Sequence, residues 1–101
     1  MQAIQIMSAL AQETRLRVYQ ILVEALPDGM PASEVAESVG MTRNGMSAHF
    51  AILTAAGLLS SEKIGRNVIY RAETFALREL TTFLSRAIDR DPNSCSGQLA
   101  W

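Results

Sequence analysis

Residues 42–56 combine an apolar stripe with a short polar face whose side chains can form specific hydrogen bonds. The apolar residues recur at three- and four-residue spacing, which is typical of a helix with one buried side: Met46, Phe50, Leu53 and Ala56. The polar residues fall mostly off this stripe, within the first two turns: Arg43, Asn44, Ser47 and His49. Arginine can bond guanine and asparagine can bond adenine in a bidentate manner, and serine can bond a base or a phosphate. The pattern therefore predicts a recognition helix whose N-terminal residues reach base edges in the DNA major groove.

Each of these polar residues has a plainer alternative, which is a helix face that contacts only solvent. We expect DNA contact at Arg43, Asn44 and Ser47, whereas contact near the DNA backbone and simple solvation stand as equal alternatives at His49. Thr42 is predicted to cap the helix, because a threonine hydroxyl can accept a hydrogen bond from a free backbone N–H in the first turn. A capping residue can also touch a phosphate, so Thr42 joins the candidate DNA-binding residues.

Three further helices are predicted before this one, over residues 3–11, 15–26 and 33–39. Thr14 is the expected N-cap of the second helix, which ends in a turn at residues 27–29 with Gly29 at positive φ. Gly40 closes the third helix, and residues 40–42 form the tight turn of a helix-turn-helix.

A β-hairpin is predicted directly after the recognition helix, with strands over residues 58–64 and 68–72 and a three-residue loop, Gly65-Arg66-Asn67. An isolated hairpin is marginal in water, so it has to pack against the helices. It corresponds to the wing of a winged helix-turn-helix. We expect Lys63, Arg66 and Asn67 to meet phosphates or the minor groove, with Arg71 pairing instead with an acid of the helical core.

The last helix is predicted over residues 75–89, which carry a continuous apolar stripe. Together these elements predict a mainly α fold with a β-hairpin wing. Residues 1–91 form one winged helix-turn-helix domain for DNA binding and dimerisation, and residues 92–101 form a C-terminal tail.

The distribution of charge supports nucleic-acid binding although the net charge of the chain is −1. Residues 38–72 contain four basic residues and one acidic residue, whereas the rest of the chain contains five basic and nine acidic residues. Phosphate binding depends on the local patch rather than on the net sum. Chance imbalance in a small protein is the alternative explanation.

Other functional classes fit this composition poorly. With one histidine, one cysteine, no glycine-rich phosphate loop and no paired acids in a plausible cleft, the chain is not expected to be an enzyme. No apolar run of 18 residues and no signal-peptide pattern are present, so a cytoplasmic protein without a membrane span is expected. The remaining rival is a winged helix that contacts another protein rather than DNA, which predicts an apolar or acidic exposed face on residues 42–56.

The chain resembles the ArsR/SmtB family of bacterial repressors in several ordered segments. The sequence Ala-Leu-Ala-Gln-Glu-Thr-Arg-Leu-Arg at residues 9–17 is similar to the N-terminal signature of that family. Residues 47–53 and 56–59 resemble its recognition helix and strand entry, and Gly65-Arg66 with Tyr70-Arg71 resembles its wing. The similarity extends from about residue 6 to residue 83, which is most of the chain.

This resemblance implies an autoregulated homodimeric repressor that binds an inverted-repeat operator and is released by an inducer. The implied dimer forms mainly through the first and last helices. The sequence supports the dimer independently, since both terminal helices carry more apolar residues than a small core can cover; the alternative is that both helices complete the core of a monomer. The expected interface residues are Ile4, Met7, Leu77, Leu80, Phe83, Leu84 and Ile88.

The inducer is less well defined, because two metal sites known in the family have no counterpart in this sequence. Pro31 and Ser33 stand where the paired thiolates of one site would be, and residues 75–89 contain no histidine for the other. Some arsenic-responsive members keep cysteines just beyond the last helix, where this chain has Cys95. Trivalent arsenic or antimony prefers two or three thiolates. Cys95 is therefore a candidate As(III) or Sb(III) ligand shared across a dimer, a redox-active thiol, or a free thiol without a role.

Overall fold

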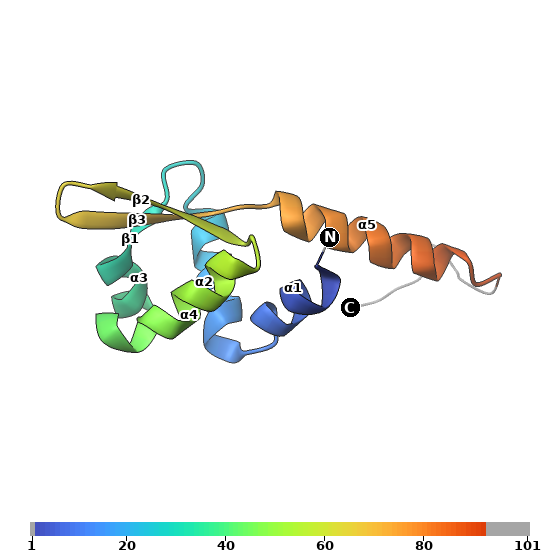
Figure 1. The fold of residues 1–101 in the computed structure, drawn as a ribbon, viewed down its shortest axis with the longest axis horizontal. Helices are drawn as coiled ribbons and strands as arrows, with labels where there is room; N and C mark the ends of the chain where they lie inside the picture. Colours follow the sequence, from blue (N-terminus) through green and yellow to red (C-terminus); the bar gives the residue numbers. More distant parts are fainter. Residues whose placement is uncertain (1, 93–101) are drawn as a thin grey trace.

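The computed structural model describes residues 2–92. Within this range the chain forms, in order, α1 (Ala3–Leu10), α2 (Glu13–Glu24), β1 (Met30–Pro31), α3 (Ala32–Ser38), α4 (Arg43–Ala55), β2 (Leu59–Ile64), β3 (Asn67–Ala72) and α5 (Phe75–Asp89) (Figure 1). The order of the five helices and the hairpin agrees with the sequence prediction, which did not include β1, and the bounds of α5 are those expected. The mainly helical class with a small antiparallel wing is confirmed. None of these helices is long and apolar enough to cross a membrane.

The core lies between the helices and one face of the sheet. The largest side chains with less than 2% exposure are Ile6, Val18, Leu22, Val35, Met46, Leu53 and Leu58. The predicted stripe of the recognition helix is buried throughout, with Met46 and Leu53 at 0% and Phe50 at 4% exposure. The rear of α4 is therefore held by α1, α2, α3 and the sheet, and its front is left for solvent.

The sheet differs from the predicted two-stranded hairpin, because β1 pairs with β3 and gives the strand order β1-β3-β2. Gly29 makes this close approach feasible: its φ is +78°, and a Cβ atom there would lie 2.5 Å from the carbonyl oxygen of Tyr70. The positive φ predicted for Gly29 is thus confirmed. Proline is tolerated at Pro31 because β1 is an edge strand.

The hairpin loop is shorter than the sequence suggested. Ile64 pairs with Asn67, so Asn67 is the first residue of β3 and the turn consists of Gly65 and Arg66. Gly65 has a φ of +62°. Glycine suits such a two-residue turn because its backbone must adopt positive φ to match the twist of the two strands.

Two local contacts correct the sequence analysis. The N-cap of α2 is Gln12 rather than Thr14, since the Gln12 side chain accepts a hydrogen bond from the backbone N–H of Arg15 at 2.9 Å. Arg71 pairs with Glu62 on the adjacent strand at 2.8 Å, and not with an acid of the helical core. Arg71 lies opposite Ser60, which puts Glu62 at the diagonal position on the same face of the sheet.

Helix α5 leaves the body of the molecule and extends to one end of its 54 Å long axis (Figure 1). Its first turns pack on the core, where Leu80 is 4% exposed and Leu77 is half-buried. Leu80 was expected at a dimer interface, but it packs in the core of its own chain and has no free apolar surface to offer. Beyond it, Phe83, Leu84 and Ile88 are 50%, 39% and 55% exposed.

Tyr19 ties α2 to the start of α5. Its hydroxyl donates a hydrogen bond to the backbone carbonyl of Glu73 at 3.1 Å, between β3 and α5. Burial raises the pKa of Tyr19, and the nearby carboxylate of Glu73 raises it further. The phenol therefore stays a neutral donor up to high pH, which keeps this link intact.

We predict that Tyr19→Phe lowers the free energy of unfolding by about 1 kcal/mol, because one part-buried hydrogen bond is lost without a change in shape. Urea denaturation measures the effect. Tyr70→Phe is the matched control, since no hydroxyl partner of Tyr70 occurs within residues 2–92 and its ring stacks on Phe50. Equal destabilisation by both substitutions would contradict the assigned role of the Tyr19 hydroxyl.

Candidate DNA-binding surface

Helices α3 and α4 are joined by the short turn that a helix-turn-helix requires. Gly40 has a φ of +71°, and its backbone N–H donates to the carbonyl of Glu37 at 3.1 Å, which ends α3. Thr42 then caps α4 as predicted, with its hydroxyl oxygen accepting from the backbone N–H of Gly45 at 2.9 Å. A Cβ atom at Gly45 would lie 3.0 Å from that hydroxyl oxygen, so a side chain at Gly45 would crowd the cap.

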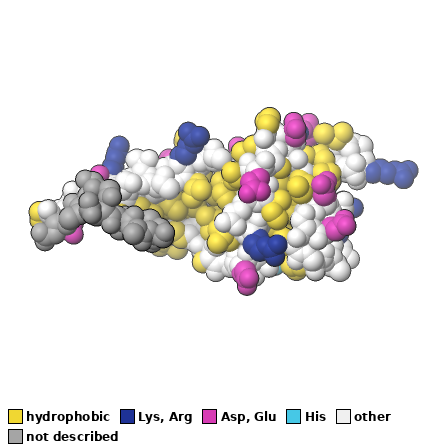
Figure 2. Space-filling model, turned by 180° about the vertical axis from the view of Figure 1, so that it is seen from behind, with side chains coloured by type: hydrophobic (Ala, Val, Ile, Leu, Met, Phe, Trp, Pro, Cys, Tyr) yellow, Lys and Arg dark blue, Asp and Glu magenta, His cyan; other side chains and the backbone are white. Residues whose placement is uncertain are grey.

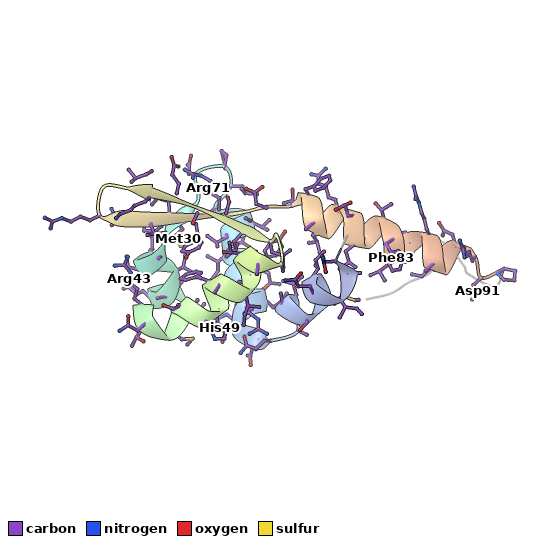
Figure 3. All side chains as sticks on the ribbon, in the orientation of Figure 1. Met30, Arg43, His49, Arg71, Phe83 and Asp91 are labelled. Atoms are coloured by element: carbon purple, nitrogen blue, oxygen red, sulfur yellow. The ribbon has the colours of Figure 1, made fainter. Side chains whose placement is uncertain are left out.

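The polar front of α4 is exposed where the sequence analysis placed it. Arg43, Asn44 and Ser47 are all exposed, and within residues 2–92 no ion pair engages Arg43. Arg43 and His49 both lie along the α4 side of the molecule, away from Arg71 on the sheet (Figure 3). Hydrogen-bonding side chains are thus displayed on a helix whose opposite face is anchored in the core, which is the arrangement needed to insert a helix into a groove.

A shallow groove separates α4 from the wing. Arg43, Ser47 and Thr54 line it from α4, and Ser61, Val68 and Tyr70 line it from the sheet. At its floor the rings of Phe50 and Tyr70 stack, with centroids 4.1 Å apart and planes inclined by 9°. This stacked pair sets the distance between the recognition helix and the wing. The groove thereby joins hydroxyl donors from two elements that are separate in sequence, including Thr54 and Ser61, which the sequence analysis did not single out.

The wing carries basic side chains at its outer end. Lys63 and Arg66 are exposed in the hairpin, and a basic side chain extends from the wing end of the molecule (Figure 2). Arg71 is paired with Glu62, which leaves Lys63 and Arg66 as the wing cations without an ion pair among the described residues. Asn67 instead lines a hollow with Glu34 and Glu37 of α3. Those carboxylates make phosphate contact less favourable at Asn67 than at the two cations.

His49 is placed differently from the other predicted DNA-binding residues. It is half-buried, and its Nδ1 lies 3.4 Å from Nη1 of Arg15 at the start of α2. Arg15 also donates through Nε to the carbonyl of Ala9 at 2.7 Å and through Nη2 to the carbonyl of Ser8 at 3.4 Å. The sequence analysis quoted Arg15 only as part of a signature, because nothing local indicates that it reaches α4.

Comparison with known proteins identifies the family. A family model described as a helix-turn-helix domain matches residues 10–62. The chain is 30% identical over 102 residues to the uncharacterized HTH-type transcriptional regulator YbzH of Bacillus subtilis, with 87% of this chain and 100% of that protein covered. It is also similar to the solved structure of an ArsR-like transcriptional regulator from Rhodococcus sp. RHA1, with 28% identity, a TM-score of 0.73, and 88% and 81% of the two chains covered. The chain belongs to the ArsR family of winged helix-turn-helix transcriptional regulators.

Two more solved structures share this fold. One is a possible transcriptional regulator for arsenical resistance, with 28% identity, a TM-score of 0.69 and 82% of each chain covered. The other is the homodimeric winged helix-turn-helix domain Mb0332 of Mycobacterium bovis, with 22% identity, a TM-score of 0.68, and 88% and 81% of the two chains covered. Both agree with the regulator's arrangement of helix-turn-helix and wing.

The inducer site considered from the sequence falls outside the part of the chain that the structure describes. Within residues 2–92 no three His, Cys, Asp or Glu side chains come close enough to hold one metal ion. Pro31 lies in β1 and Ser33 in α3. Cys95, the candidate thiol, lies outside the described residues.

Proposed function

We propose that this ArsR-family regulator is a sequence-specific repressor that binds an inverted-repeat operator as a homodimer and leaves it in response to an inducer. The main support is the two-sided character of α4. Its rear residues Met46 and Leu53 are 0% exposed, whereas Arg43, Asn44 and Ser47 face solvent. Such a helix can enter the major groove without any rearrangement of the core.

The proposed contacts divide into base reading and phosphate binding. Arg43 suits guanine, Asn44 suits adenine, and Ser47 suits a base or a phosphate. Thr42 keeps its cap at the start of the same helix and can also touch a phosphate, while Lys63 and Arg66 reach phosphates or the minor groove from the wing. Phosphate contacts set register and affinity, and base contacts set specificity.

The proposed homodimer forms through α1 and the outer half of α5. On α1, Ile4 is 81% and Met7 41% exposed, and on α5 the apolar residues beyond Leu80 are also exposed. Apolar side chains gather over the middle of the molecule on the face seen in Figure 2. A symmetric pair would bury such surface. It would also place two copies of α4 about 34–36 Å apart, one turn of DNA.

A winged helix that binds only protein is the alternative of a different class. That alternative requires an apolar or acidic front on α4. No acidic residue lies on this helix, and its exposed apolar residues, Ala48, Ala51, Ile52 and Ala55, follow the polar Arg43, Asn44 and Ser47. A salt titration separates the two, because DNA binding releases counterions and weakens steeply as salt rises.

We predict that Arg43→Ala weakens binding to the selected operator by about 1–3 kcal/mol and relaxes sequence preference at one position in each half-site. The operator is first selected by the wild-type protein from a random-sequence pool, and fluorescence anisotropy then measures affinity. Arg90→Ala, at the far end of α5, removes the same charge and is the control. Unchanged specificity in the Arg43 variant would remove this residue from the base-reading set.

We predict that Arg66→Ala weakens binding almost equally on selected and random duplexes, because the wing turn contacts phosphate rather than bases. The slope of log affinity against log salt should fall by about 1 for each protomer. Anisotropy at several salt concentrations measures the slope. A loss confined to the selected duplex would instead mean that Arg66 reads sequence.

We predict that Phe83→Glu converts the dimer into monomers, because it places a charge in the proposed apolar interface. Sedimentation velocity measures the oligomeric state. Ile64→Glu in the wing is the matched control, since Ile64 and Phe83 are 52% and 50% exposed in the single chain. If the wild-type protein is itself a monomer at micromolar concentration, the proposed dimer is wrong.

The proposed inducer site is Cys95, which would bind As(III) or Sb(III) with the thiol of the second protomer or respond to oxidants. We predict that arsenite, antimonite or peroxide releases the wild-type protein from its operator and has no effect on Cys95→Ser. Anisotropy titrations on operator DNA measure release, and zinc serves as the comparison metal. Release of the Cys95→Ser protein by the same compounds would eliminate both sensing proposals and leave a regulator controlled in another way.

A further inference from the structure

Two signature segments that are far apart in the sequence meet at one side-chain contact. Arg15 stands near the start of α2 and His49 in the middle of α4, 34 residues apart, with Nη1 and Nδ1 3.4 Å from each other. The other nitrogens of Arg15 are held by the C-terminal carbonyls of α1 at Ala9 and Ser8. The guanidinium is thus fixed on one side by α1 and faces the imidazole on the other.

The chemistry of this contact determines the tautomer of His49. Arginine has only donors and stays protonated, so the Nδ1 atom facing it has to accept the hydrogen bond. A neutral imidazole that accepts at Nδ1 carries its proton on Nε2. Within residues 2–92, Arg15 is the one hydrogen-bond partner found for His49, which leaves the Nε2–H as a donor without a protein acceptor.

The position of His49 on α4 indicates what that donor can reach. Ser47 and Thr54 lie on the flank of α4 that faces the wing, whereas His49 lies on the opposite flank, beside α2. A helix in the major groove has one sugar–phosphate strand along each flank, because the groove is only about 12 Å wide. The wing flank therefore faces one strand, and the half-exposed ring of His49 faces the other.

We infer that Arg15 is a positioning residue for DNA binding: it holds His49 with Nε2–H outward, so that this group donates a hydrogen bond to a phosphate on the α2 side of the groove. The inference rests on the proposed DNA-binding function and adds a contact to the second DNA strand. It also connects α1 to the recognition helix, since the same guanidinium binds both. A second link, from the Gln5 amide to the carbonyl of Ala55 at 3.2 Å, attaches α1 to the end of α4.

The tautomer can be tested without DNA, because the chain contains one histidine. Long-range nitrogen–proton NMR spectra at alkaline pH, where imidazole is neutral, report which ring nitrogen carries the proton. We expect the Nε2–H form in the wild-type protein and a mixture in Arg15→Lys, whose single ammonium cannot bond the α1 carbonyls and the ring together. Arg17→Lys, an exposed neighbour on α2, should give the wild-type spectrum. A wild-type spectrum showing Nδ1–H, or one unchanged by Arg15→Lys, would overturn the inference.

Affinity for the selected operator tests the phosphate contact. Arg15→Lys keeps the charge, so long-range attraction to DNA is unchanged, yet we expect about tenfold weaker binding from the loss of an oriented donor to a charged group. His49→Asn removes the outer nitrogen and should cause a similar loss. The double variant should bind no more weakly than either single variant, because both changes remove one interaction. Arg17→Lys should bind like the wild-type protein.

The outcomes distinguish a failure of the proposed DNA-binding function from a failure of the roles inferred for Arg15 and His49. If the wild-type protein binds no duplex, the proposed function fails, while the NMR result still decides the role of Arg15 in holding the ring. If the wild-type protein binds and His49→Asn binds equally well, the proposed function stands and the phosphate contact is wrong. Fully additive losses from Arg15→Lys and His49→Asn would also overturn the inference, since the residues would then act independently. Thermal unfolding of each variant confirms that a folded protein is being compared.

Discussion

The burial of one face of α4 is the constraint on which the rest of the structure depends. Removing a large apolar side chain from water contributes roughly 1.5–3 kcal/mol, and α4 buries Met46, Phe50 and Leu53 together. Their burial fixes the rotation of the helix about its axis, so the residues between them are forced to face solvent. The stack of Phe50 on Tyr70 then fixes the wing relative to the same helix. Recognition geometry is therefore a product of core packing.

The small size of the chain accounts for the surface that this core leaves uncovered. A small domain has a limited interior, and within residues 2–92 the core is filled before α5 ends. Leu80 completes the interior, and the apolar residues that follow it remain on an extended arm. Phe83 and Ile88 are exposed for the same reason, and the proposed dimer would cover them with a second copy of the chain. The proposed operator spacing would then follow from the small size of the core.

The acidic and basic residues are also distributed unevenly along the chain. The chain is acidic overall at −1, but the acids and bases are not mixed evenly. Glu62 neutralises Arg71 within the sheet. Within residues 38–72 the cations without an ion pair are therefore Arg43 on α4 and Lys63 and Arg66 in the wing. Glu34 and Glu37 of α3 stand beside the base of the wing and limit the basic area further. A narrow basic surface of this kind favours correct placement on DNA over general attraction to it.

Local sequence was sufficient for the features that depend on neighbours along the chain. The buried stripe of α4, the bounds of α5, the Thr42 cap and the positive φ of Gly29 each arise from helical spacing or from conformational preferences that act within a few residues. The exposed set of Arg43, Asn44 and Ser47 follows directly from that stripe. The order of elements also pointed to the family, since each has a recognisable local pattern.

Tertiary structure alone decided the contacts between residues that are distant in sequence. Three features depend on how whole elements pack: the pairing of β1 with β3, the burial of Leu80 and the contact of Arg15 with His49. Sequence periodicity does not predict such packing. Even the cap of α2 is Gln12 rather than Thr14, although threonine is the preferred N-cap residue type. The helix begins at Glu13, and the Gln12 side chain accepts from the backbone N–H of Arg15. Sequence determined which faces are apolar or polar, and packing determined what each face touches.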